Sequence, residues 1–331
     1  MVRSEARFVL LFAVAGAISA QSAFAQMRLT NAAANAAANA VADLSEMTLA
    51  AVTLPTDSSL RKSLTSVPTP GPGPKATAVE TGFARSQLLN SRVLAARTAK
   101  KMELKQLFRS RGLDYPAAEI YLRAFKRESE MELWVRPQGA DTFVLLKSYD
   151  VCALSEKPGP KRNKGDYQTP EGFYFIDDFN PQSSYHLSLR VNYPNESDKI
   201  LGSTKTKALG GDIFIHGNCK TAGCLAVTDE NIKEIYWLAV EARDHGQSRI
   251  PVHIFPARLS NNNLAQFENV FGKTNPELIG FWTNLKRGYD MFEQTHKLTQ
   301  VSVNKFGRYV FGDPAEQLLG KPTTVDVVAQ H

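Results

Sequence analysis

The stretch of sequence that decides the fold reads Gly211-Asp-Ile-Phe-Ile-His-Gly-Asn-Cys-Lys-Thr-Ala-Gly-Cys-Leu-Ala-Val-Thr-Asp229. A short β-prone run ends at His216, and Gly217 directly after it permits a sharp turn with a positive φ. Asp229 stands where a helix cap or first turn belongs, because apolar residues recur at helical spacing over 232–242. The pattern predicts a strand, a glycine-rich loop and a helix, in that order.

A thiol and an imidazole flank this glycine-rich loop. The thiolate is the nucleophilic form of cysteine, and a free thiol with a pKa of about 8.5 is mostly protonated at neutral pH. An imidazole within hydrogen-bond reach can take that proton, which makes His216 the candidate general base for Cys224. We therefore expect Cys224 to react with an apparent pKa below that of a free cysteine. The alternatives are a core cysteine and a structural histidine at a strand end.

The backbone beside the cysteine has a second possible use. A small residue at Gly223 would let a substrate carbonyl approach the N–H groups next to Cys224, which would form an oxyanion site. The predicted helix begins about five residues after Cys224, so we expect little help from its dipole.

Upstream of this stretch, the sequence is typical of a β-rich domain preceded by a helix. Apolar residues at helical spacing over 84–111 predict a helical segment, 83–112. Apolar and polar residues then alternate over 120–124 and 131–135, which predicts two strands, and residues 143–149 would form a third.

Downstream of the predicted helix, the chain carries an extension. Asn261–Asn263 predict a loop, and 267–271 and 277–296 have helical patterns. Residues 301–311 then suggest a closing hairpin. We interpret 259–313 as a helical and hairpin extension packed on the core. Residues 314–331 are expected to be a loose tail.

The N-terminus has the pattern of an export signal. Arg3 and Arg7 precede an apolar run over 8–18, and Ala23-Phe-Ala25 matches a cleavage site. We expect residues 1–25 to be a signal peptide cleaved after Ala25. Residues 26–82 contain no Phe, Tyr or Trp, so they are predicted to be a low-complexity, disordered tether.

Composition excludes several classes of protein. The chain has 331 residues, and its 39 Lys+Arg against 33 Asp+Glu give a net charge of +6, with only three Trp. The sequence has no concentrated basic patch of the kind that would predict nucleic-acid binding. After the signal peptide no apolar run reaches the roughly 18 residues of a transmembrane helix, so no mature membrane span is expected.

Several separated motifs resemble one family. His216-Gly217 with Thr221-Ala-Gly-Cys224 resembles the HGx…(S/T)xGC signature of L,D-transpeptidase catalytic domains, the YkuD family. Gly165-Asp-Tyr-Gln-Thr-Pro-Glu-Gly-Phe-Tyr174 resembles the TPxGxF/Y turn and strand of that family. Further motifs look like the YafK-like branch of periplasmic murein L,D-transpeptidase-related proteins: Gly159-Pro-Lys161, Tyr193-Pro-Asn195, Gly223-Cys-Leu-Ala-Val-Thr-Asp229 and Phe281-Trp282.

The resemblance implies a fold and a chemistry. The fold would be α+β, mainly β with flanking helices: an L,D-transpeptidase-like β-sandwich or barrel core over 113–258 with an α-helical C-terminal extension. Cys224 would attack the carbonyl of the L-centre of meso-diaminopimelate in a peptidoglycan stem peptide, with His216 as general base and Gly217 and Gly223 shaping the loop and oxyanion site. An amine of a second stem peptide would resolve the acyl-enzyme. The periplasm would be the location, and no metal or organic cofactor is implied.

The sequence departs from the family at one instructive position. Many members carry Arg two residues after the nucleophile, where this chain has Ala226. Loss of a bidentate carboxylate partner changes which donor or acceptor fits. An alternative reading is therefore a hydrolase that releases a covalently attached outer-membrane protein from peptidoglycan through the same thioester. A non-catalytic peptidoglycan-binding protein is the alternative of another class.

Other side chains are secondary candidates. His186, Tyr185 and Thr221 could line the substrate cleft, although a histidine on a strand that alternates with leucines is more often structural. A zinc site built from His186, His216, Cys219 and Cys224 is disfavoured by the ligand spacing. In an oxidising compartment Cys152 and Cys219 could form a disulfide, whereas a Cys219–Cys224 pair or three free thiols are the alternatives.

Overall fold

The computed structural model describes residues 82–155, 157–202 and 208–312. The predicted signal peptide, the tail 314–331 and all of the predicted tether except its last residue lie outside the described residues. None of the helices in the described part of the chain combines the length and the apolar character needed to cross a membrane.

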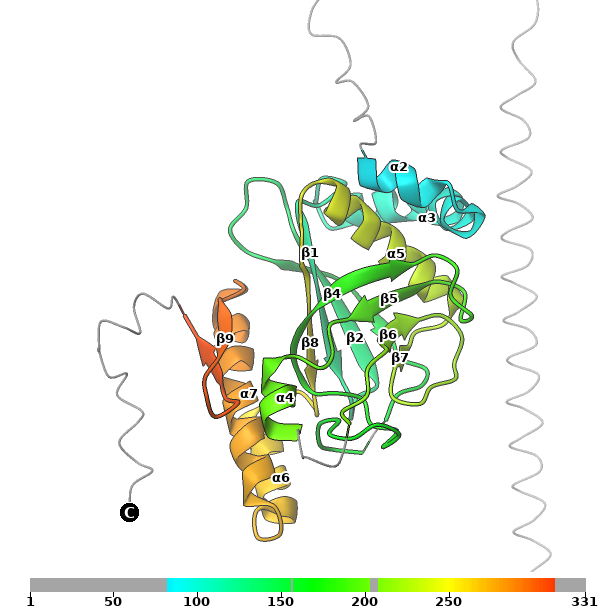
Figure 1. The fold of residues 1–331 in the computed structure, drawn as a ribbon. Helices are drawn as coiled ribbons and strands as arrows, with labels where there is room; N and C mark the ends of the chain where they lie inside the picture. The colour runs from blue at the N-terminus through cyan, green and yellow to red at the C-terminus, as the bar shows by residue number, and fades with distance from the viewer. Residues whose placement is uncertain (1–81, 156, 203–207, 313–331) are drawn as a thin grey trace, which may run out of the picture. The chain divides into compact units, whose positions relative to one another are not determined.

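The framework is one curled sheet of eight strands in the order β3-β2-β1-β8-β4-β5-β6-β7 (Figure 1). Neighbouring strands pair in antiparallel fashion except β1 with β8 and β6 with β7, which are parallel. The strands are β1 (Glu119–Phe125), β2 (Glu130–Arg136), β3 (Val144–Asp150), β4 (Gly172–Asn180), β5 (Ser188–Val191), β6 (Ile213–His216), β7 (Leu225–Ala226) and β8 (Ile250–Phe255). A separate hairpin joins β9 (Val301–Val303) and β10 (Tyr309–Phe311).

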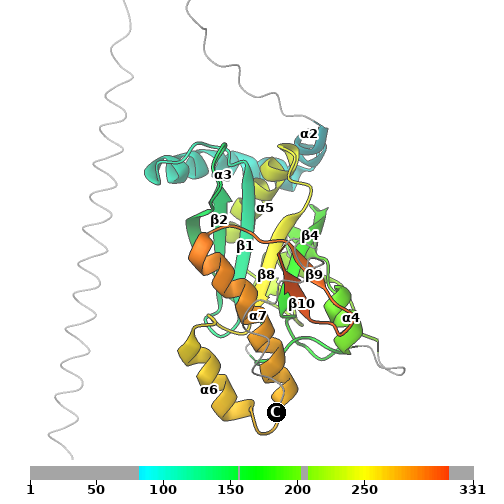
Figure 2. The same cartoon turned by 90° about the vertical axis from the view of Figure 1, so that its left-hand side faces the viewer.

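Helices cover both faces of the sheet. On one face lies α5 (Asp229–Asp244), which is in turn covered by α2 (Gly82–Leu88) and α3 (Ser91–Ser110) (Figure 1). On the other face α7 (Pro276–Thr295) crosses β1 and β8, as Figure 2 shows. The remaining helices of the described residues are α4 (Glu196–Gly202) and α6 (Asn261–Phe271). The fold class expected from the sequence, α+β, is confirmed.

Strand alternation divides the core into two layers. On β1, Ile120 and Leu122 belong to the core under α5, whereas Tyr121 and Phe125 belong to aromatic clusters under α7. Apolar and polar residues alternate in the sequence of β1 and β2, but the polar positions of these strands are largely buried as well. Because α7 covers the face on which they lie, even Arg123 is 2% exposed, and its guanidinium is paired with the carboxylate of Glu132 at 2.7 Å.

The helix boundaries differ from the predictions at two places. The single helix expected over 84–111 is broken, because the side chain of Asn90 accepts a hydrogen bond from the backbone N–H of Arg92 and thereby caps α3. Leu89, an apolar residue within the expected helix, is 86% exposed. Asn261–Asn263, expected to be a loop, form the first turn of α6, because the Ser260 hydroxyl caps that helix.

A buried ion pair connects the extension to the core. The ammonium of Lys126 and the carboxylate of Glu171 are 2.9 Å apart, and both side chains are fully buried. Glu171 also accepts hydrogen bonds from the backbone N–H of Gly159 and from the indole N–H of Trp282 on α7. Every charged atom of the pair therefore has a partner, which is the condition for burying charge without a large penalty. The ammonium of Lys126 also donates to the carbonyl oxygens of Gly159 and Thr169, so the pair holds the loop at Gly159 and the residue that follows Gln168.

Candidate active site

Strand register places His216 and Cys224 on the same face of the sheet. On β6, Ile213 and Ile215 point into the core under α5, so Phe214 and His216 point to the opposite face. Ile215 pairs with Leu225 and His216 with Ala226 across the parallel β6–β7 ladder. Cys224 therefore lies beside Phe214, diagonal to His216 and on the same side.

That face opens into a cavity of about 320 Å³ that contains both side chains. Its lining residues are Asn180, Ser183, Ser184, Tyr185, Ser188, Asp212, Phe214, His216, Lys220, Thr221, Ala222 and Cys224. A larger cavity of about 800 Å³ lies beside α7 and the β9–β10 hairpin, but its lining has neither cysteine nor histidine. The chemistry therefore points to the smaller cavity.

The imidazole of His216 is oriented for a role as a base. Its Nδ1 lies 2.6 Å from the carbonyl oxygen of Gly217, and since that oxygen can only accept, Nδ1 carries the proton. Nε2 is left as the acceptor. Burial lowers the pKa of His216 below its usual value, while the Gly217 carbonyl opposes that shift. The ring of Tyr185 stacks on the imidazole with centroids 4.6 Å apart.

The thiol of Cys224 is half-buried and its proton is retained. Its Sγ lies 3.6 Å from the carbonyl oxygen of Asp212. Burial raises the pKa of Cys224 above its usual value, and the Asp212 carboxylate adds to this, while the backbone N–H of Phe214 and the ammonium of Lys161 act in the opposite direction. The expectation of a lowered thiol pKa is therefore contradicted. The resting site holds a neutral thiol and a neutral imidazole, so the proton has to move during attack.

The turn after His216 is built differently from the prediction. The positive φ belongs to Asn218, at 63°, and Gly217 does not share it. Glycine is needed at 217 for space, because a Cβ there would lie 2.5 Å from Oδ1 of Asp229 and 2.8 Å from the carbonyl oxygen of Tyr185. The Asp229 carboxylate accepts a hydrogen bond from the backbone N–H of Asn218 at 2.7 Å. The first turn of α5 therefore holds the loop in place.

Gly223 and Thr221 set the conformation just before the nucleophile. Gly223 has a φ of 126°, and a Cβ there would lie 2.6 Å from the carbonyl oxygen of Gln168. The Thr221 hydroxyl donates to the carbonyl oxygen of Cys224 at 2.8 Å and accepts from the N–H of Gly223 at 3.0 Å. Because this N–H already has a partner, it is not free to serve an oxyanion.

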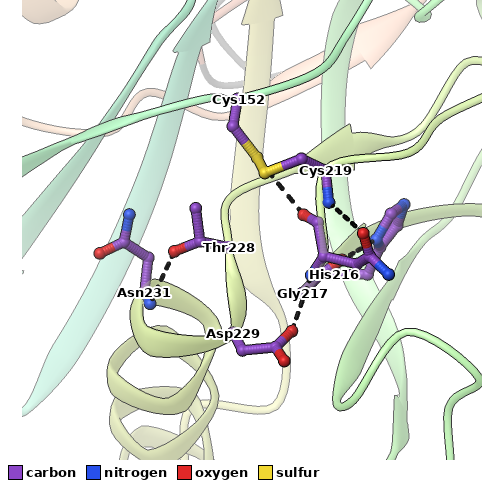
Figure 3. Close-up of a disulfide and its surroundings, with 8 residues drawn as sticks. Cys152, His216, Gly217, Cys219, Thr228, Asp229 and Asn231 are labelled. Atoms are coloured by element: carbon purple, nitrogen blue, oxygen red, sulfur yellow. Dashed lines mark hydrogen bonds between the residues drawn. A yellow bond between two sulfur atoms is a disulfide. The ribbon is translucent and has the colours of Figure 1, made fainter.

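A disulfide braces the loop from outside the cavity. Cys152, which follows β3, is bonded to Cys219, with Cα atoms 5.4 Å apart (Figure 3). Cys224 is the free cysteine of the three. The zinc set considered from the sequence is not assembled, since Cys219 is in the disulfide. In the part of the chain that the structure describes, no group of three or more His, Cys, Asp or Glu side chains is arranged to hold a metal ion.

His186 lies elsewhere than predicted. It precedes β5 in a bend with a φ of 72°, and it is not among the residues that line the cavity. Its Nε2 is buried without a hydrogen-bond partner. Burial lowers its pKa. Its carbonyl oxygen and that of Ser183 both accept hydrogen bonds from the guanidinium of Arg92 on α3, at 2.9 and 2.6 Å. Arg92 thus holds the segment that carries Tyr185.

The comparisons with known proteins identify the family of this chain. Residues 127–254 match the family model described as the L,D-transpeptidase catalytic domain, YkuD. A protein of Escherichia coli strain K12 named "Putative L,D-transpeptidase YafK" is 35% identical over 205 residues, which are 61% of this chain and 78% of that protein. The chain belongs to the YkuD family of L,D-transpeptidase catalytic domains. Its matched region contains His216, Cys224 and the disulfide-bonded cysteines.

Solved structures of similar proteins share less sequence with this chain. The helical cell shape determining protein Pgp2 from Campylobacter jejuni is 18% identical, with a TM-score of 0.33, over 56% of this chain and 73% of that one. Bd1075 from Bdellovibrio bacteriovorus is 17% identical, with a TM-score of 0.30, over 56% of this chain and 74% of that one.

Sequence reasoning missed three contributors to the site. Asp212 and Lys220 line the cavity but were not singled out, although strand alternation from His216 back to Asp212 is a signal for the first. Arg92 lies outside the matched region, and no local pattern connects it to residues about ninety positions away.

Proposed function

We propose that this protein is a periplasmic cysteine acyltransferase that acts on meso-diaminopimelate-containing stem peptides of peptidoglycan. The observation that carries the proposal is the shared cavity of His216 and Cys224, in which Nδ1 of the imidazole is engaged by Gly217 and Nε2 is left as the base. Membership of the YkuD family supports the substrate class.

In the first half-reaction, Nε2 of His216 takes the proton of Cys224 while Sγ attacks the carbonyl carbon of the diaminopimelate L-centre. Stacking against Tyr185 holds the imidazole in place. The resulting imidazolium gives its proton to the departing amine, the C–N bond breaks, and a D-amino acid leaves. The acyl group remains on Cys224 as a thioester.

In the second half-reaction, an amine of another stem peptide attacks the thioester, and His216 again takes and returns the proton. A hydrolase is the second candidate, in which water replaces the amine and a covalently attached outer-membrane protein is released. The presence of Ala226 supports the hydrolase as a second candidate. This residue is fully buried, and its N–H and C=O bond to Ala153 and Cys152, so position 226 offers no cation to a peptide carboxylate.

The test separates both reactions from simple binding. The purified protein is incubated with muropeptides and with sacculi that carry covalently attached protein, and the products are identified by mass spectrometry. Diaminopimelate–diaminopimelate dimers indicate transfer, whereas released protein indicates hydrolysis. If Cys224→Ala behaves like the wild type in both assays, catalysis is refuted and a non-catalytic peptidoglycan-binding protein is the remaining reading.

A further inference from the structure

The cavity contains one cation and one anion that the proposed chemistry does not use. Asp212 and Lys220 both line it, and both are exposed. Among the residues that the structure describes, none forms an ion pair with either side chain. The nearby Arg190 feels the charge of Asp212, but its guanidinium is already held by Asp177 at 2.8 Å. Two opposite charges are therefore available to a ligand.

The backbone holds both residues close to the nucleophile. Asp212 precedes β6 and has a φ of 57°, in the left-handed region that Asp adopts more readily than most residues with side chains. Its carbonyl oxygen contacts Sγ of Cys224 at 3.6 Å. Lys220 directly follows Cys219, whose disulfide ties the loop to Cys152. Asp212 is thus held next to the nucleophile through its own backbone, and Lys220 lies in the disulfide-braced loop that leads to the nucleophile.

We propose that Asp212 and Lys220 are specificity-determining residues that bind the zwitterionic end of the acyl donor. The carboxylate of Asp212 receives a free ammonium group, and the ammonium of Lys220 receives a free carboxylate. This inference rests on the proposed function, since the side chain of meso-diaminopimelate ends in a D-centre that carries both groups. Lys220 thereby supplies the cation that buried Ala226 cannot supply.

The contact made by each of the two charges can be tested with a different donor. A donor whose D-centre carboxylate is amidated loses only the contact with Lys220, and a lysine-containing donor loses the same contact because lysine lacks that carboxylate. A donor whose D-centre amine is acetylated loses only the contact with Asp212. Charge-assisted contacts in a half-solvated cavity are consistent with a loss of about tenfold in kcat/KM for each missing group.

The experiment crosses these donors with variants of the full chain. The wild type should prefer the free diaminopimelate tetrapeptide to its amidated form by about tenfold, and Lys220→Ala should lose that preference while Lys105→Ala keeps it. Asp212→Asn should no longer discriminate between the free and the acetylated donor, whereas Asp114→Asn should still prefer the free donor. Lys105 and Asp114 are exposed residues outside the cavity. Unchanged thermal unfolding of each variant shows that the fold is intact.

Failure of the inference and failure of the proposed function look different. If the wild type turns over stem peptides but Lys220→Ala and Asp212→Asn discriminate as the wild type does, the recognition pair is refuted and the catalytic proposal stands. If the wild type turns over nothing, calorimetric binding of the three tetrapeptides to the wild type and to the same variants decides. Binding that discriminates in the wild type but not in the variants supports the pair, and equal binding of all donors refutes it.

Discussion

The phenol ring of Tyr185 lies on the imidazole of His216, with centroids 4.6 Å apart and an interplanar angle of 26°. Tyr185 itself is 41% exposed. Its ring therefore shields one face of the imidazole from solvent, while the outer side of the Tyr185 ring stays in contact with solvent. The backbone on either side of Tyr185 is held from a distance, because Arg92 on α3 donates to the carbonyl oxygens of Ser183 and His186. A helix outside the matched catalytic region therefore positions the shield over the base.

Replacing Arg92 by alanine should release this segment and reduce kcat about five- to tenfold, as expected for the loss of two charge-assisted hydrogen bonds. Because the imidazole would become more solvated, its lowered pKa should rise back towards the usual value of about 6.5. The acidic limb of the pH–rate profile should then move to higher pH. Arg92→Lys, which can keep one of the two bonds, should fall between the wild type and Arg92→Ala.

Arg109→Ala is the matched control, because Arg109 is an exposed arginine at the other end of the same helix. A merely structural role for Arg92 would lower stability without moving the acidic limb. An unchanged limb in an Arg92→Ala protein of reduced activity would therefore contradict the positioning role.

Local sequence pattern could predict the core of the site. His216 ends a short β-prone run, and Cys224 follows a glycine-rich loop, so both positions depend on neighbours within about fifteen residues. The same is true of β1, β2 and β3, which lie where the local sequence pattern predicted three strands. These features are set by backbone geometry close in the chain, which periodicity reports directly.

Other features depend on contacts between distant segments, and periodicity does not report them. Polar residues alternate with apolar ones along β1 and β2, a pattern typical of strands with one face in solvent, but here α7 covers that face and the Arg123–Glu132 pair is buried. The direction of the Cys224 pKa shift depends on how deeply the thiol is buried and on the Asp212 carboxylate. Neither can be inferred from the spacing of His216 and Cys224 alone.

The two pKa shifts at the site predict a broad pH optimum. The pKa of His216 is lowered, so the imidazole is already the neutral base above about pH 6.5. The pKa of Cys224 is raised, so the thiol keeps its proton well into the alkaline range. The neutral thiol and the neutral imidazole therefore coexist between these limits. As pH increases, kcat/KM should rise up to about pH 6.5 and then stay level to about pH 8.

Alkylation of Cys224 by iodoacetamide tests the thiol separately. Since the other two cysteines form the disulfide, the reaction reports Cys224 alone. Its rate should still be increasing at pH 8.5, near the pKa of an ordinary thiol of about 8.5. His216→Ala should hardly change this curve, because the resting thiol is not ion-paired with the imidazole. If the alkylation rate of the wild type reached a plateau below pH 8, the thiolate would be preformed and this mechanism would be wrong.

Gly223 should tolerate no side chain. Alanine there would need a φ of 126° and would place its Cβ 2.6 Å from the carbonyl oxygen of Gln168. Backbone strain of this kind costs on the order of 1–3 kcal/mol, and relief of the clash would also move Cys224. Gly223→Ala should lower kcat/KM at least about tenfold and reduce the free energy of unfolding by roughly 2 kcal/mol.

Gly211→Ala serves as the comparison, because Gly211 lies near the same cavity but a Cβ there meets no atom within 4 Å. It should remain close to the wild type in both activity and denaturant unfolding. Wild-type activity in Gly223→Ala would mean that the loop before the nucleophile relaxes without consequence, and the assigned role of this glycine would be wrong.

The Cys152–Cys219 disulfide should contribute both stability and loop order. It closes a loop with a sequence separation of 67, for which chain entropy gives a stabilisation of about 4 kcal/mol. Cys152→Ser/Cys219→Ser should lose stability of this order in denaturant unfolding, and its kcat should fall because the 217–224 loop loses its external brace. A phosphine reductant should lower the unfolding midpoint of the wild type but leave that of the double variant unchanged. If reductant shifts both proteins equally, or if the double variant unfolds at the wild-type midpoint, the brace contributes nothing and the loop is held by the Asp229 and Thr221 hydrogen bonds alone.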